Sequence, residues 1–182
     1  YRSPYPLPDE QGELKANLPT MFAAVPIRNT AGKIIAAFGV RIRPDLDFTR
    51  ILEVVRFGQS GETFAFDRNG LLLSQSRFDD LMKQIGLLAD QPDARSILTV
   101  ELRDPQVNMV LGERPALRRS EQPLTFLAAH ATQGQDGFNA DGYRGYRGMQ
   151  RVGAWRWLKE YEFGVGTEVN AEEAFAPVYI LR

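Results

Sequence analysis

The strongest constraint on the fold is an alternating segment near the end of the chain. In FGVGTEV (163–169), apolar or β-branched residues alternate with glycine and glutamate, which is the period of two of a half-buried strand. A second strand-like run, VGAWRWL (152–158), precedes it across the polar break KEYE (159–162). Two such runs around a short polar break predict an antiparallel hairpin.

A helix is expected directly after this hairpin. Asn170 can accept from the backbone N–H of Glu173, and Glu173 can reach back, which predicts a capping-box-like helix start. The apolar residues that then fall at helical spacing are Ala174, Phe175, Val178 and Ile180. The segment therefore reads as strand, turn, strand and helix.

The front of the chain contains a similar arrangement. Residues 1–20 hold four prolines and little periodicity, which predicts a loop or an extended arm. Residues 21–27 and 33–42 then form a second hairpin candidate. Residues 47–57 carry apolar positions at helical spacing, with Asp47 as the expected cap.

These two arrangements suggest a structural repeat. FGVRI (38–42) is followed by DFTRIL (47–52), as FGVGTEV is followed by AEEAFAPV (171–178), although a chance match of short strand–helix units is the alternative. A repeat would make residues 1–45 the tail of one module and 46–182 a second, complete module.

The middle of the chain should supply one more hairpin and an insert on one face of the sheet. The expected elements are a strand at 63–66, a turn at 67–70, a return strand at 71–74, a short helix at 79–88, a short strand at 96–104 and a short helix at 123–131. Much of 89–142 otherwise reads as loop, which often marks a ligand lid. Hairpins flanking a central excursion predict an antiparallel sheet.

Composition excludes several classes of function. The chain has 182 residues, no cysteine and one histidine, His130, so thiolate and His-rich metal sites are excluded. Its formal net charge is −1 with no long block of one sign, which argues against nucleic-acid binding. No apolar run approaches the ~20 residues of a membrane span. We expect the chain to be a piece of a longer protein.

The sequence resembles a known family of receptor domains. GQSGETFAFDRNGLLLSQSRF (58–78), ELRDP (101–105), YRGYRGMQRVGAWRWL (143–158) and FGVGTEVNAEEAF (163–175) look like the extracytoplasmic Cache domains of bacterial membrane receptors. The resemblance is to the membrane-proximal half of double-Cache sensors and covers most of 21–180.

This resemblance implies a fold and a role. The implied fold is α+β and PAS-like, with a central antiparallel sheet of five or six strands and helices and long loops on one face. The implied role is an extracytoplasmic, periplasmic or extracellular signal-input domain that relays small-molecule binding to a cytoplasmic kinase, cyclase or chemotaxis module. It also implies a transmembrane helix just past Arg182 and a homodimer as a further expectation. Residues 1–45 would be the remnant of the membrane-distal module.

A cluster of aromatic and charged residues is the candidate ligand site. Trp155 and Trp157 share one face of their strand, with Arg156 on the other. An aromatic wall with a guanidinium suits a small carboxylate, and an aspartate could hold an amine, so the partner would be an organic acid, an amino acid or an amine. The candidate ligand-binding residues are Tyr143, Arg147, Trp155, Trp157, Phe64, Phe66, Asp67 and Arg77. The alternative is that the tryptophans are core.

The two alternatives to a ligand-binding domain are a structural module and an enzyme. A structural spacer or dimerisation module would relay a signal without binding ligand, and its cavity would be filled by the same aromatic residues. An enzyme is not expected, because His130 is the only histidine base and the adjacent acidic pairs Asp79–Asp80 and Glu172–Glu173 diverge on helices. No cofactor or metal is expected. His130 is expected to be a hydrogen-bonded loop or helix residue, and Arg77 to face the pocket or pair with Asp79 or Asp80.

Overall fold

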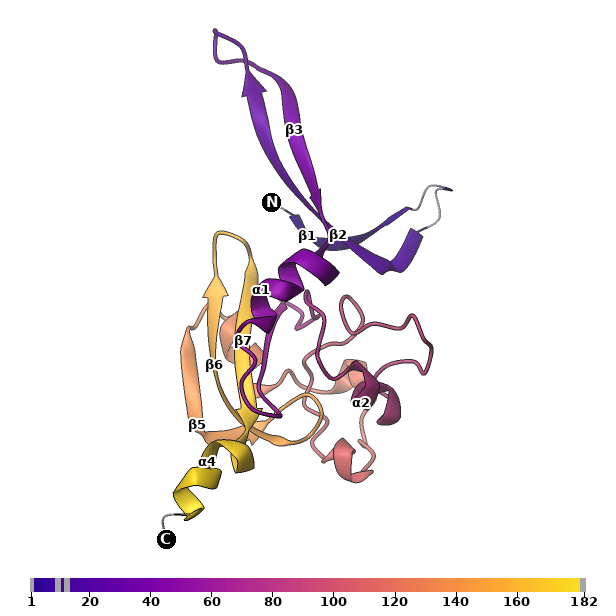
Figure 1. Cartoon of the computed structure of the whole chain (residues 1–182), viewed down its shortest axis with the longest axis vertical. Coiled ribbons are helices and arrows are strands. Elements are labelled where there is room, and N and C mark those ends of the chain that lie inside the picture. Colours follow the sequence, from indigo (N-terminus) through magenta and orange to yellow (C-terminus); the bar gives the residue numbers. More distant parts are fainter. Residues whose placement is uncertain (1, 9–10, 12–13, 181–182) are drawn as a thin grey trace.

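The computed structural model describes residues 2–8, 11 and 14–180, which form two antiparallel sheets and several short helices (Figure 1). The strands are β1 (Arg2–Pro8), β2 (Leu14–Arg28), β3 (Ile34–Ile42), β4 (Glu62–Phe66), β5 (Gly137–Arg144), β6 (Gln150–Leu158) and β7 (Phe163–Asn170). The helices are η1 (Pro44–Phe48), α1 (Thr49–Glu53), α2 (Asp79–Gln84), η2 (Met109–Leu111), η3 (Arg119–Glu121), α3 (Phe126–Thr132) and α4 (Ala171–Ile180). One sheet has the strand order β1-β2-β3 and the other the order β4-β7-β6-β5.

The four-stranded sheet is built around β7. This strand pairs antiparallel with β4 on one side and with β6 on the other. The register places Phe64, Gly166 and Trp155 in one row across the three strands. A Cβ on Gly166 would lie 2.9 Å from the Leu127 methyls and 3.1 Å from the Phe64 ring, so glycine allows bulky side chains to close over this strand.

Both faces of this sheet are covered. The inner face carries the main core, which includes Phe64, Phe66 and both tryptophans. The other face packs Leu52 of α1 against Phe163, and the Phe48 and Phe163 rings meet edge-on with centroids 5.7 Å apart. The expectation of a half-buried final strand is therefore wrong, because α1 and its neighbours cover the second face as well.

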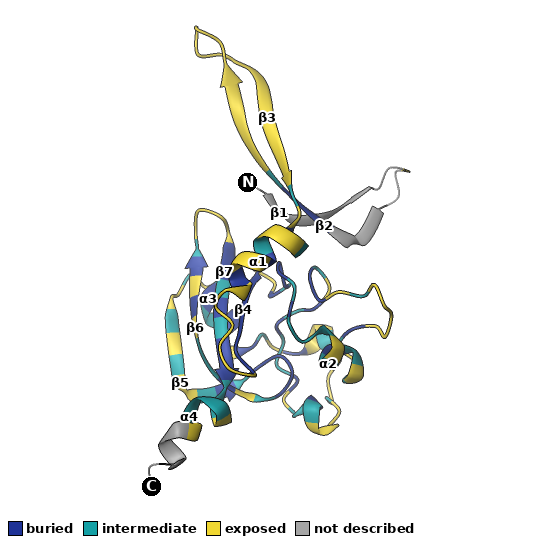
Figure 2. Ribbon diagram, in the orientation of Figure 1, coloured by how far each residue is buried: buried dark blue, intermediate teal, exposed yellow. Residues whose placement is uncertain are grey.

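The insert packs on the inner face, as expected. Its buried side chains in the main core are Val100, Leu102, Leu127, Ala128 and Ala131. The helix expected at 123–131 is α3, which begins where the Thr125 side chain accepts from the backbone N–H of Ala128. Figure 2 shows the buried residues gathered in this layered part of the molecule.

The β2–β3 ribbon extends away from the four-stranded sheet (Figure 1). Most of its residues between 23 and 41 are exposed (Figure 2), including Val25 at 59%, Ile35 at 61% and Phe38 at 60%. The hairpin expected at 21–27 and 33–42 is confirmed, and its turn uses Gly32 with a φ of +78°. The ribbon is therefore an apolar surface without a packed core of its own.

Several expected elements differ from the structure. Residues 2–8 and 14–20 belong to β1 and β2 rather than to a loop. Prolines are compatible with an edge strand such as β1, and Pro19 lies in the part of β2 that pairs with β1 alone. The helix expected over 47–57 is shorter and is formed by η1 and α1, and Asp47 accepts from the backbone N–H of Arg43. Helix α2 stops at Gln84, before Gly86 with its φ of +76°.

The central sheet has fewer strands than expected. Within the described residues it has four rather than five or six. The return strand expected at 71–74 and the strand at 96–104 are reduced to isolated bridges, in which Leu72 pairs with Phe66 and Glu101 with Leu71. Conversely, β5 lies where a loop was expected. The expectation followed from the Gly, Asn and Asp residues of this segment, which are poor strand formers.

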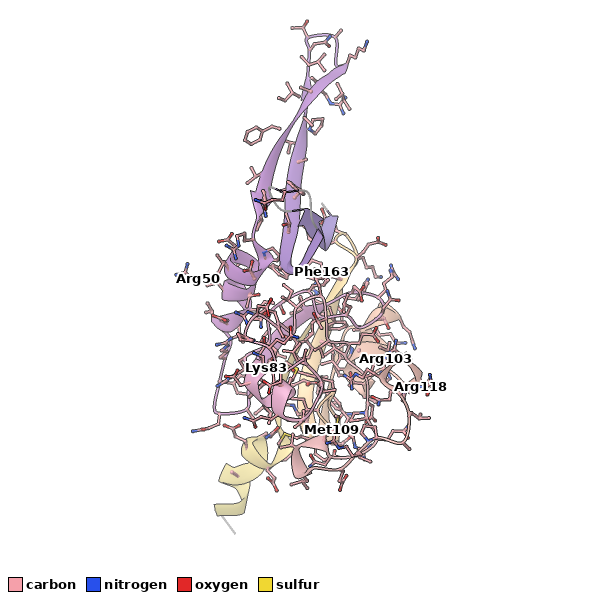
Figure 3. The ribbon with its side chains drawn as sticks, turned by 90° about the vertical axis from the view of Figure 1, so that its right-hand side faces the viewer. Arg50, Lys83, Arg103, Met109, Arg118 and Phe163 are labelled. Atoms are coloured by element: carbon pink, nitrogen blue, oxygen red, sulfur yellow. The ribbon has the colours of Figure 1, made fainter. Side chains whose placement is uncertain are left out.

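Helix α4 begins at the residue after β7 ends. It lies at the opposite end of the long axis from the β2–β3 ribbon (Figures 1 and 3). The side chains of Val178 and Ile180, expected on its apolar stripe, and Arg182 lie outside the described part. Within that part, we find no helix with the length and apolarity that a bilayer span requires.

Candidate functional site

Four of the candidate residues are core residues. Phe64 and Phe66 are 1% and 0% exposed, and Trp155 and Trp157 are 7% and 4% exposed. All four belong to one packed cluster that also contains Leu127. The prediction that Trp155 and Trp157 share one face of their strand is confirmed, and all four side chains fill the space between the sheet and the insert.

Asp67 and Arg77 hold local backbone structure. The Asp67 Oδ1 atom accepts from the backbone N–H groups of Asn69 and Leu71, both at 2.8 Å, which is a turn-stabilising role. Arg77 donates to the Gly61 carbonyl at 2.8 Å. Among the described residues it makes no ion pair with Asp79 or Asp80, which was one of the two roles expected for it.

His130 is a helix residue, as expected. Its Nδ1 lies 2.8 Å from the Phe126 carbonyl, and its ring contacts Phe126 and Trp155. In the part of the chain that the structure describes, no three His, Cys, Asp or Glu residues are grouped as a metal site requires.

The two remaining candidates, Tyr143 and Arg147, meet at a buried charged cluster. This cluster consists of Glu62, Glu168, Arg147 and Arg151, each 2–3% exposed. The Tyr143 hydroxyl donates to Glu168 Oε1 at 2.8 Å, and Arg151 Nε lies 3.6 Å from Glu168 Oε2. Two carboxylates and two guanidiniums thus balance each other at the end of the inner face where β4 begins and β7 ends.

Burial has the largest effect on the pKa values of Glu168 and Tyr143. Desolvation raises the pKa of Glu168 above its usual range, and the nearby Arg151 charge and the Tyr143 hydrogen bond partly oppose that shift. Burial, together with the neighbouring carboxylate Glu168, also raises the pKa of Tyr143, so its hydroxyl stays protonated and remains a donor.

Arg147 is one of two incompletely paired members of the charged cluster, the other being Glu168, whose Oε2 also has no hydrogen-bond partner among the described residues. Arg147 Nη2 lies 4.0 Å from Glu62 Oε2, beyond hydrogen-bond distance, and this buried atom has no hydrogen-bond partner among the described residues. The guanidinium instead lies over the Phe78 ring, 3.7 Å from its centroid. A buried guanidinium without acceptors is costly, because its donors lose water without replacement.

Arg147 also lines a cavity. The cavity has a volume of ≈ 460 Å³, within the range of small-molecule sites. Its apolar lining side chains are Phe78, Leu81, Val110 and Met149. Asn170 and Glu173 line it as well, so the cavity touches the point where β7 becomes α4.

A hydrogen-bonded junction holds the start of α4 to the loop before β4. The Glu173 carboxylate accepts from the backbone N–H groups of Gln59, at 2.6 Å, and Ser60, at 2.8 Å, and from the Ser60 hydroxyl. These bonds, the Ser60 hydroxyl first, lower the pKa of Glu173. Glycine suits position 58, because its φ is +58° and a Cβ there, 2.1 Å from Glu173 Oε1, would displace the carboxylate. We call Gln59, Ser60 and Glu173 the latch.

The latch replaces the expected capping box. The Glu173 carboxylate accepts from Gln59 and Ser60. The Asn170 side chain accepts from Arg151 Nη1 rather than capping the helix. Arg151 also donates to the Ser60 carbonyl at 3.3 Å. Arg151, a member of the buried charged cluster, therefore links that cluster to Ser60 of the latch.

Sequence reasoning missed Glu62, Glu168 and Arg151 as site residues. The signal for Glu168 was present, since it shares a strand face with Gly164 and Gly166. Glycines on one face of a strand indicate close approach by large side chains, and this face is the one against the core.

Comparison with known proteins identifies similar folds but no similar sequences. No protein-family model and no curated protein matches the sequence. The structure is similar to the extracellular domain of a protein named as a histidine kinase, mmHK1S-Z3, with a TM-score of 0.52 and 16% identity over 98% of this chain and 51% of that chain. It is also similar, with a TM-score of 0.48 and 16% identity, to the ligand-binding domain of the amino acid chemoreceptor PctB of Pseudomonas aeruginosa PAO1, solved with L-Arg, over 99% of this chain and 53% of that chain.

The chain thus spans about half of the length of these structures. The similarity to this extracellular domain confirms the expected fold, which is α+β and PAS-like (Cache) with an antiparallel sheet.

Proposed function

We propose that the chain is the extracytoplasmic signal-input domain of a bacterial transmembrane receptor, which passes a change in the buried charged cluster to α4. The observation that carries this proposal is the latch: the first turn of α4 is bonded to the loop that enters β4. A change that alters this loop or Arg151 would bias the position of α4. A ligand can produce such a bias only through different affinities for two states, typically 1–3 kcal/mol of coupling.

The fold supports this role, since an extracellular domain of a kinase shares it. In the proposal, residues 46–182 are the membrane-proximal module and residues 1–45 belong to a membrane-distal module. The exposed apolar ribbon agrees with the second assignment, because an exposed patch of this kind normally has a partner. A transmembrane helix beyond α4 and a homodimer belong to the same proposal.

A spacer or dimerisation module that binds no ligand is the second candidate. The filled core favours it, because Phe64, Phe66, Trp155 and Trp157 occupy the space first considered for a ligand. The sensor and the spacer differ in whether a small molecule changes the output. Both would transmit their signal through the latch.

The proposal is tested by releasing the latch. The chain is fused through α4 to the membrane helix and kinase module of a bacterial receptor with a reporter gene. Glu173→Ala removes three hydrogen-bond acceptor contacts and should change the basal output by about 5-fold or more. Glu172→Ala is the matched control, because Glu172 is exposed on the same turn and lies outside the latch.

The outcome is judged at equal amounts of each receptor in the membrane. Identical reporter output from Glu173→Ala, Glu172→Ala and the unaltered chain would contradict transmission through the latch. A change caused equally by both variants would also contradict it, since it would reflect helix charge alone.

A further inference from the structure

The cavity beside Arg147 differs from the space first expected to hold a ligand. It lies between Phe78 and Leu81 near α2, Val110 of η2, and the junction of β7 with α4. Segments from the insert, the β5–β6 connection and the latch all contribute to its wall. A molecule in this cavity would touch the insert and the output helix at once.

The charged group in this cavity that lacks a hydrogen-bond partner is the Arg147 guanidinium, a cation. Among the described residues, the Arg147 side chain makes no hydrogen bond, only the 4.0 Å approach to Glu62 and the ring contacts with Phe78 and Tyr146. A guanidinium presents donors in a planar fork that matches a carboxylate. The other charged group that lines the cavity, Glu173, already accepts three hydrogen bonds, so nothing there requires an ammonium group.

The remaining lining is apolar. Phe78, Leu81, Val110 and Met149 are suited to an aromatic or branched hydrocarbon body, and methionine adapts to irregular shapes. Apolar walls with one oriented polar group are the usual composition of a small-molecule site.

We propose that this cavity binds a small monocarboxylate with an apolar body, whose carboxylate pairs with Arg147 and whose body lies among Phe78, Leu81, Val110 and Met149. The signalling role of this ligand rests on the proposed sensor function, whereas its binding to the cavity can be measured independently. By contacting both the insert and Asn170, such a ligand would favour one position of α4.

The test is calorimetric titration of the 182-residue chain with 3-phenylpropanoate, 4-methylpentanoate and benzoate at millimolar concentration. The neutral control is 3-phenylpropanamide, which has the same body without the charge. The acid should bind about 10- to 100-fold more tightly than its amide, because a charge-assisted pair is lost in the amide. L-Phenylalanine, which adds only an ammonium group to 3-phenylpropanoate, should bind no more tightly than the acid.

Variants locate the site. Val110→Trp fills the cavity without replacing any residue of the buried charged cluster and should abolish binding. Leu111→Trp is the matched control in the same turn, since Leu111 is 76% exposed and does not line the cavity. The double variant Glu62→Gln/Arg147→Met removes both charges of the pair, so neither is left buried alone, and should reduce the preference for acid over amide to about 1-fold.

Three results would overturn the proposal. They are binding of none of the three acids, equal binding of acid and amide, or unchanged binding by Val110→Trp. Binding of L-phenylalanine more than about 10-fold tighter than the acid would overturn the assignment to monocarboxylates. Acid binding that leaves the reporter output unchanged in the receptor fusion would overturn the sensor function and leave the site intact, which separates the two failures.

Discussion

Tyr143→Phe isolates the hydrogen bond that Glu168 accepts at Oε1. The change removes one hydroxyl and keeps the ring, so it leaves Glu168 Oε1 without its 2.8 Å donor in a site that is 2% exposed. A hydrogen bond to a charged group contributes about 1.5–3 kcal/mol. For a chain of this size we expect the melting temperature to fall by about 3–12 °C.

The loss should depend on pH, and its sign follows from Glu168. Burial raises the pKa of this carboxyl above its ordinary value of 4.5, so the folded state binds the proton more tightly than the unfolded state. That contribution to stability is present below the unfolded pKa and is lost as the pH rises through the folded pKa. Removing the Tyr143 donor raises the folded pKa further, so the variant should lose more stability than the unaltered chain as the pH rises.

The assay is urea unfolding of both proteins between about pH 4.5 and about pH 8. The difference in unfolding free energy should grow from about 0.5–1.5 kcal/mol, typical of a neutral hydrogen bond, to about 1.5–3 kcal/mol. Ile97→Val is the control, because Ile97 is 1% exposed and its truncation should cost about 0.5–1.5 kcal/mol at every pH. A Tyr143→Phe difference that is constant with pH, or that shrinks as the pH rises, would refute the reasoning.

Two further predictions concern the core and the ribbon. Trp155→Ala should lower the unfolding free energy by about 3–5 kcal/mol. It should leave 3-phenylpropanoate binding unchanged when calorimetry is performed below the melting temperature. Lost binding at unchanged stability would show that the tryptophans form the ligand site. Phe38→Ser should change the unfolding free energy by no more than about 0.5 kcal/mol and reduce self-association in analytical ultracentrifugation, because the 60% exposed ring is an apolar surface; a large drop in melting temperature would show that the ring is packed.

The sequence predicted the elements that have a clear period. The alternation in 163–169 and the paired tryptophans at 155 and 157 gave the hairpin of β6 and β7, the antiparallel pairing and the shared core face with Phe64. These succeeded because buried strands leave a residue pattern of period two.

The rest depended on tertiary contacts. Strand β5 contains Gly, Asn and Asp, and its pairing with β6 overrides their weak preference for strands. The role of Glu173 could not be predicted, because its partners Gln59 and Ser60 lie more than a hundred residues earlier. The sequence pointed to Arg147, but its cavity depends on how α2 and η2 fold against it.

The central position of β7 has a mechanical consequence. A tension applied along α4 passes into a strand that is laddered to a neighbour on each flank, so two rows of hydrogen bonds resist it in shear together. Because α4 begins at the residue after β7 ends, the helix and the central strand of the sheet would be displaced as one piece.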